Sequence, residues 1–97
     1  MAALYGGTVL TPGIISDEGL QTYLQSIARF KEATRKAKVE VEIQNHPIFD
    51  GTPERLARLK AAAPGDPHPF VIGNARYISM WNIVSECIQA EIARREP

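Results

Sequence analysis

The chain has 97 residues, and its 11 lysines and arginines balance its 11 aspartates and glutamates, so its formal net charge is zero. A chain of this length forms at most one small domain, and a neutral balance removes the usual electrostatic reason to bind nucleic acid or an acidic membrane. One cysteine, Cys87, excludes an internal disulfide and a cysteine-based zinc site, and no apolar run reaches the roughly 18 residues of a membrane helix. The first residues lack a basic stretch before an apolar core, so we expect no secretion signal in this chain.

The N-terminal third predicts short strands followed by a long helix. Apolar residues at 3–5 and 9–10 flank two glycines and indicate one interrupted strand or two very short ones. A helix is expected over residues 17–37, because Ser16 is a good N-cap and acidic residues follow it at the positive end of the helix dipole. The helix has an apolar stripe at three- and four-residue steps, which comprises Leu20, Tyr23, Leu24, Ile27 and Phe30.

Residues 39–43 alternate strictly and predict a half-buried strand. Three β-branched residues should face the core, while Glu40 and Glu42 should lie on the other side. Two carboxylates on one face could act as a catalytic pair, but a solvated strand face is far commoner. The strand ends at Asn45-His46-Pro47, because proline cannot donate to a central ladder.

Two further helices are predicted in the second half of the chain. One should span about 53–62, with Thr52 as N-cap and Pro53 in the first helical position, and its apolar line is Leu56, Leu59 and Ala63. The other should span about 75–95, with Asn74 as its cap. Its stripe comprises Tyr77 or Ile78, Trp81, Val84, Ile88 and Ile92.

The predicted helices need more covering surface than the predicted strands provide, because an apolar helix stripe must be covered by another layer. A two-stranded sheet is too narrow to cover three amphipathic helices, and it leaves both edges open. One interpretation is the flank of a larger sheet, most of which this chain does not encode. The other is a compact three-helix domain with a small hairpin, and the pattern alone does not choose between them.

His46 is the most interesting candidate for chemistry, since it directly follows a strand and imidazole is a common neutral metal ligand. Position alone favours the simpler interpretation of a loop histidine bonded to backbone. A catalytic zinc needs about three protein ligands, and the spacing of His68 makes no chelate with His46. Asp50 could orient an imidazole as a carboxylate partner, although a turn residue before Gly51 is the preferred interpretation.

The remaining candidates favour structural roles. Cys87 lacks a catalytic histidine or aspartate at recognisable spacing, so a small thiol in the core or at its boundary is expected. Trp81 has the spacing of a core residue. No Ser-His-Asp set can be argued, and Gly6-Gly7-Thr8 lacks the frame of a phosphate loop, so we assign no catalytic residue.

Several segments together resemble the C-terminal part of a metallo-β-lactamase-fold hydrolase, closest to the third subclass of zinc β-lactamases. The resemblance rests on Asn45-His46-Pro47-x-Phe49-Asp50-Gly51, Leu56-Ala57-Arg58-Leu59 and Pro67-His68-Pro69-Phe70-Val71. Upstream, Leu4-Tyr5-Gly6-Gly7-Thr8, the helix with Tyr23-x-x-Ser26-x-x-Arg29-Phe30, and Val39-Glu40-Val41 are similar to the family's preceding elements.

The resemblance implies an α/β fold, namely part of a four-layer αββα sandwich with two zinc ions, here with three helices and two to three strands. It implies that His46 is the terminal histidine of the second zinc site, that His68 has no metal role, and that Asp50 and Gly51 shape the neighbouring loop. Intact relatives are exported to the periplasm, hydrolyse the amide of small β-lactam substrates with zinc-bound hydroxide, and thereby confer antibiotic resistance.

The chain departs from the family pattern, because the H-x-H-x-D-H motif and the middle metal histidine are absent. We therefore expect residues 1–97 to form a single incomplete domain that binds zinc weakly at most and does not hydrolyse β-lactams alone. The alternative is a non-enzymatic α/β module whose exposed stripes form a homodimer or dock on a partner. A further alternative is complementation by an N-terminal chain that supplies the other ligands.

Overall fold

The structure is a computed structural model, and it describes residues 1–5, 11–44 and 51–97. Over these residues the chain is a mixed α/β structure, as expected, with three helices and two short parallel strands. The elements in chain order are β1 (Ala2–Leu4), α1 (Asp17–Lys36), β2 (Val41–Ile43), α2 (Thr52–Ala61) and α3 (Asn74–Arg95). The order β1–α1–β2 is a crossover unit, in which the helix returns the chain so that both strands run the same way. No helix in these ranges is both long and apolar enough to cross a membrane.

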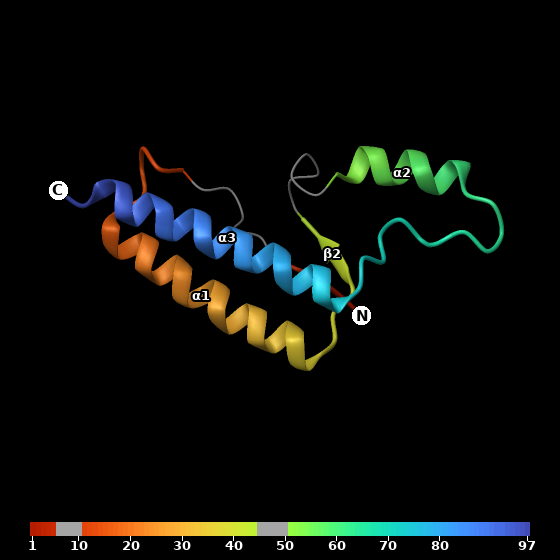
Figure 1. Ribbon diagram of the computed structural model, residues 1–97, viewed down its shortest axis with the longest axis horizontal. Coiled ribbons are helices and arrows are strands. Elements are labelled where there is room, and N and C mark those ends of the chain that lie inside the picture. Colours follow the sequence, from red (N-terminus) through yellow and green to blue (C-terminus); the bar gives the residue numbers. More distant parts are fainter. Residues whose placement is uncertain (6–10, 45–50) are drawn as a thin grey trace.

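The core lies between α1 and α3, which run antiparallel side by side in Figure 1. The predicted stripes of both helices are confirmed, because their central members meet and are fully buried. The helix residues in this core are Leu20, Ile27, Tyr77, Trp81 and Ile88. Edge-to-face contacts with Trp81 add to the packing, with ring centroids 5.1 Å away at Tyr5 and 5.4 Å away at Phe30. The helix pair is therefore the stable centre of the described chain.

The structure confirms one of the predicted helix N-caps and corrects the other two. The Ser16 hydroxyl accepts a 3.0 Å hydrogen bond from the Gly19 amide, as expected for an N-cap. Thr52 and Asn74 are instead the first helical residues, and the caps are Gly51 and Gly73, both with positive φ. Residues other than glycine rarely adopt such a positive φ, so glycine takes the cap position in both cases.

The Asn74 side chain is free for a tertiary role because Gly73 caps α3. Its amide Nδ2 donates a 2.8 Å hydrogen bond to the Val39 carbonyl and a longer one, 3.5 Å, to the Thr34 carbonyl. These bonds attach the start of α3 to the last turn of α1 and to the segment that leads into β2.

The alternation of residues 39–43 slips by one position, which corrects the predicted faces. Val39 is buried and Glu40 exposed, as expected, but Glu42 is only 3% exposed and Ile43 is 41% exposed. The cause is visible in the backbone, because the amides of both Glu40 and Val41 donate to the Met1 carbonyl. Two residues opposite one is the arrangement of a β-bulge, which reverses the faces beyond it.

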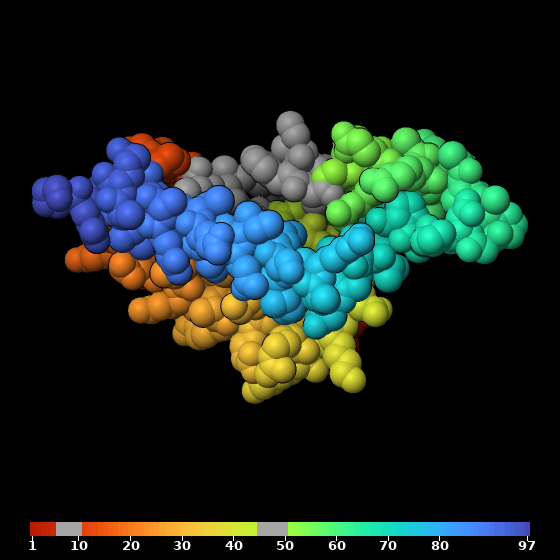
Figure 2. Space-filling view, viewed as in Figure 1, coloured from red at the N-terminus to blue at the C-terminus, as the bar shows by residue number. Residues whose placement is uncertain are grey.

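The molecule is elongated, with extents of 55 × 28 × 18 Å. Its radius of gyration is 15.4 Å, whereas a compact chain of this length would have about 12.5 Å. Most of the extension comes from α2 and the following loop, which project beyond the helix pair in Figures 1 and 2. No residue of α2 is buried, and its predicted apolar line remains open, with Leu56 44% and Leu59 38% exposed.

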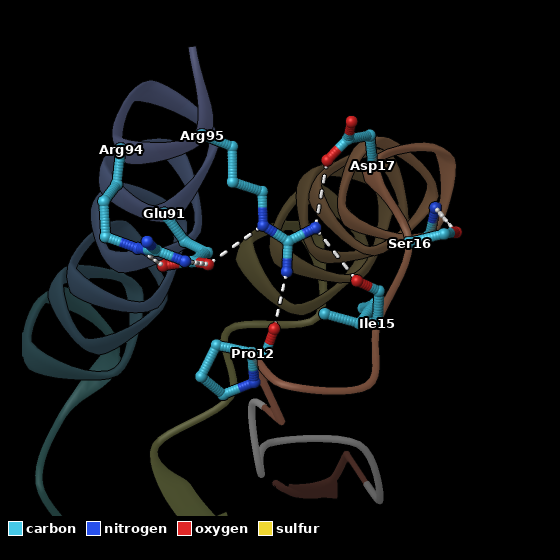
Figure 3. A network of polar contacts seen from close by, with 8 residues as sticks. Pro12, Ile15, Ser16, Asp17, Glu91, Arg94 and Arg95 are labelled. Carbon is cyan, nitrogen blue, oxygen red and sulfur yellow. Dashed lines mark hydrogen bonds and ion pairs between the residues drawn. The ribbon is translucent and has the colours of Figure 1, made fainter. Parts of the chain in front are cut away.

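A single arginine near the end of α3 binds the loop that precedes α1 (Figure 3). The Arg95 guanidinium donates to the Pro12 carbonyl at 2.7 Å, to the Ile15 carbonyl at 2.9 Å and to the Asp17 carboxylate at 3.0 Å. Its Nε also donates to Glu91, one helical turn earlier. Arg95 therefore joins the end of α3 to the start of α1 at one end of the helix pair, whereas the neighbouring Arg94 contacts only Glu91 in Figure 3.

This network makes the free energy of unfolding depend on pH in the acid range, through the ionisation of Glu91. Hydrogen bonds from Arg94 and then Arg95 lower the pKa of Glu91 from 4.5 to about 2. Because the folded value is the lower one, the stabilisation is complete above pH 4.5 and is lost as the pH falls toward 2. We expect Glu91→Gln to unfold more easily than the parent chain at pH 6, and the difference to shrink at pH 2.5. Urea titrations at both values measure this, and an equal difference at both would contradict it.

Candidate functional site

The predicted metal histidine cannot be placed. His46 and Asp50 lie outside the described residues, so the zinc assignment stays a prediction. Across residues 1–5, 11–44 and 51–97, no group of three or more His, Cys, Asp or Glu side chains could hold a metal ion. The described residues therefore do not fit a complete zinc site.

The described residues instead form a cleft of about 570 Å³ between α2, the loop after it and the start of α3. Three arginines come to this cleft from two helices that are distant in sequence. Arg55 and Arg58 lie one turn apart on α2, and Arg76 lies in the first turn of α3. The rest of the wall is mostly apolar and includes Pro67, Pro69, Val71 and Ile72. Low-dielectric walls strengthen the field of charges gathered in a cleft.

Arg55 is the most constrained of the three cations. Its Cζ lies 6.0 Å from the centre of the Phe70 ring, which is a weak cation–π contact. Its Nη1 is buried and has no hydrogen-bond partner among the described residues. Burying a guanidinium N–H without an acceptor is unfavourable, so the position of Arg55 costs free energy in the ligand-free chain.

His68 and Asp66 complete the polar part of the cleft. The Phe70 amide donates to His68 Nδ1 at 3.2 Å, so in the neutral ring the proton is on Nε2, which remains a donor. The Asp66 carboxylate accepts from the Ala63 amide at 2.8 Å, which stabilises the turn after α2. The resemblance gave His68 no metal role, and that expectation stays a prediction.

A second surface feature is the face of the sheet that points away from the helices. Leu4 pairs with Ile43, and Val41 forms an isolated bridge with Val71, so the side chains of these four residues share one face. Leu4 is 53%, Ile43 41% and Val71 48% exposed, while Val41 is half-buried. This apolar sheet face, Leu4–Val41–Ile43–Val71, has no cover from the described chain.

The bulge before β2 also corrects the expected position of a carboxylate. Glu42 was predicted on a solvated face, but it lies beneath the sheet near Tyr77. Burial raises the pKa of the Tyr77 phenol, and the Glu42 charge adds to that rise. Glu40 remains exposed, so the two carboxylates lie on opposite faces and do not form a pair.

Cys87 is exposed, which contradicts the expectation of a thiol in the core or at its boundary. Its helix turns it to the outer side, while Trp81 and Ile88 face α1 and confirm the predicted core. Sequence reasoning missed the three arginines of the cleft. Arg55 and Arg58 could have been noticed at their three-residue spacing, but nothing local indicates that Arg76 would join them.

Comparison of the chain with models of protein families, with curated proteins and with solved structures found no match.

Proposed function

We propose that this chain is one flank of a larger α/β sandwich, that of a metallo-β-lactamase-like zinc hydrolase, and that His46 supplies one ligand of its second zinc. The observation that supports the proposal is the apolar sheet face. A sandwich of four layers requires a sheet with helices on one face and a second sheet on the other. Within residues 1–5, 11–44 and 51–97 the helices cover only the inner face, and the outer face is apolar and uncovered.

The direction of the side chains in β2 strengthens the argument. The bulge directs Val41 and Ile43 outward and places the Glu42 carboxylate on the helix side. An isolated small domain would gain by burying two β-branched residues rather than a glutamate. The outward direction is favourable when another layer covers those residues, since each half-exposed side chain would contribute about 1 kcal/mol on burial.

In this proposal the chemistry belongs to the completed domain. A bound zinc would act as a Lewis acid and lower the pKa of water, which requires about three protein ligands to hold the ion. This chain contributes His46, three residues after β2 in the sequence, and holds the adjoining sheet against α1 and α3. We therefore expect no hydrolysis of β-lactams by these 97 residues alone.

Zinc titration with paired histidine variants tests the assignment. A single imidazole should give a dissociation constant weaker than about 1 µM, because one ligand cannot enclose the ion. His46→Ala should abolish that weak binding, whereas His68→Ala, the matched control, should leave it unchanged. Calorimetry on the full chain measures both, and nitrocefin reports hydrolysis. Loss of binding in the His68 variant alone, sub-micromolar binding by the monomer, or nitrocefin turnover would contradict the proposal.

A second candidate is a self-associating module without enzymatic activity. It is favoured by the same apolar face together with the open edge of β1, which pairs only with β2 in the described chain. Two copies could cover each other's sheet faces around a two-fold axis.

Sedimentation velocity separates the two candidates. If the module is correct, the wild-type chain should form a dimer that dissociates in Ile43→Glu, since a charge at the centre of the face opposes burial. Ile83→Glu, on an α3 position that is 62% exposed, is the matched control and should leave the dimer intact. A folded wild-type monomer at all concentrations would exclude the module and leave the sandwich flank as the supported role.

A further inference from the structure

We propose that the arginine cleft, lined by Arg55, Arg58 and Arg76, binds a phosphate monoester of a small organic molecule. The inference is independent of the zinc assignment, because the cleft is built by α2, the loop after it and the start of α3. Val71 is the described lining residue that the cleft shares with the apolar sheet face. Its volume of about 570 Å³ falls within the range of small-molecule pockets, which is about 300–1,000 Å³.

The charges of the cleft match a dianion. Three guanidinium groups face one carboxylate, Asp66, so a surplus of two positive charges remains. No ion pair in the described chain involves these arginines, whereas Arg35, Arg94 and Arg95 are all paired with acidic side chains. A phosphate monoester has a charge of about −1.5 to −2 at neutral pH. Its oxygens also suit the planar fork of donors that arginine presents.

The donors are held in place before a ligand arrives. Arg55 rests against the Phe70 ring, and its buried Nη1 is without an acceptor. The Phe70 amide also fixes His68 so that Nε2 is a donor in the neutral ring. Donors that need little reordering bind at lower entropic cost.

The remaining wall suits the organic part of such a molecule. Pro69, Val71 and Ile72 provide apolar surface in the same cleft, beside the cationic groups. A site with a few convergent polar groups and apolar walls favours a phosphate attached to an apolar body over the free inorganic ion. We therefore expect phenyl phosphate to bind more tightly than inorganic phosphate.

Titration of the full-length chain with phenyl phosphate, followed by amide NMR at low salt, tests the proposal. Signals of Ala62, His68 and Val71 should shift in a saturable way. Arg55→Gln and Arg76→Gln should each weaken binding about tenfold or more, since each removes a charge-assisted hydrogen bond. Benzoate, with the same ring and a single charge, should bind at least several-fold more weakly than phenyl phosphate.

Arg29→Gln is the matched control, because it removes the same charge from an exposed position on α1 outside the cleft. It should change the affinity less than twofold, and circular dichroism should show that all three variants are folded. An equal loss in Arg29→Gln would reveal unspecific charge attraction and overturn the proposal. Equal affinity for benzoate and phenyl phosphate, or shifts without saturation, would overturn it as well.

Discussion

Trp81→Ala is expected to remove a large part of the stability of the chain. The Trp81 side chain is fully buried, and its ring meets those of Tyr5, Phe30 and Tyr77 at centroid distances of 5.1, 5.4 and 6.2 Å. Removing a buried aromatic side chain costs about 3–5 kcal/mol, because the cavity collapses only partly. A domain of this size has a total stability of only about 5–15 kcal/mol, so a substantial part of it would be lost. Urea unfolding followed by far-ultraviolet circular dichroism measures the loss.

Ile83→Ala provides the control on the same helix. Ile83 is 62% exposed, so its truncation should change the free energy of unfolding by less than about 0.5 kcal/mol. If both variants were equally stable, Trp81 would not lie in the core, and the packing of α1 against α3 would be contradicted.

Arg95→Ala is expected to lower the midpoint of thermal unfolding by about 5 °C, whereas Arg94→Ala should lower it by about 1 °C or less. The two arginines are adjacent and share Glu91, but only Arg95 reaches the loop before α1. The Arg95 side chain is 19% exposed and that of Arg94 is 67% exposed. Loss of Arg95 leaves the Pro12 and Ile15 carbonyls without this donor, while loss of Arg94 removes only a surface ion pair.

The comparison needs no further variant, because each arginine controls for the other. Both substitutions remove one positive charge from the last turn of α3, so their effects on the helix dipole are similar. Equal shifts in the midpoint would mean that the contacts across the helix pair do not contribute, and that only the net charge matters.

The helices could be predicted from the sequence because their signals are local. The stripe of α1 and the Ser16 cap depend on residues within a few positions of one another, and both are confirmed. The caps of α2 and α3 were placed one residue late, because the preceding glycines adopt positive φ that neighbouring residues do not reveal.

The faces of β2 could not be predicted, since the bulge depends on the Met1 carbonyl some 40 residues away. Strict alternation assumes an unbroken ladder, and one extra residue reverses every side chain beyond it. The arginine cleft had no local signal for a similar reason, because Arg76 reaches it only through the path of the loop between α2 and α3.

The uncovered α2 was anticipated in part. The sequence predicts three helices with apolar stripes and a sheet too narrow to cover all of them. The exposure of Leu56 and Leu59 agrees with that expectation. The rival expectation of a compact three-helix domain is wrong for the described residues, because α2 buries no side chain against α1 or α3.

The exposure of the apolar sheet face is tested most directly by solvent paramagnetic relaxation of methyl protons, recorded where the chain is monomeric. A soluble gadolinium chelate should broaden the methyl signals of Leu4, Ile43 and Val71 as strongly as those of Ile83, which is 62% exposed. The fully buried Ile27 should stay sharp as the internal reference. If the three face residues were as protected as Ile27, the sheet would already be covered within this chain, and its role as a flank awaiting another layer would be contradicted.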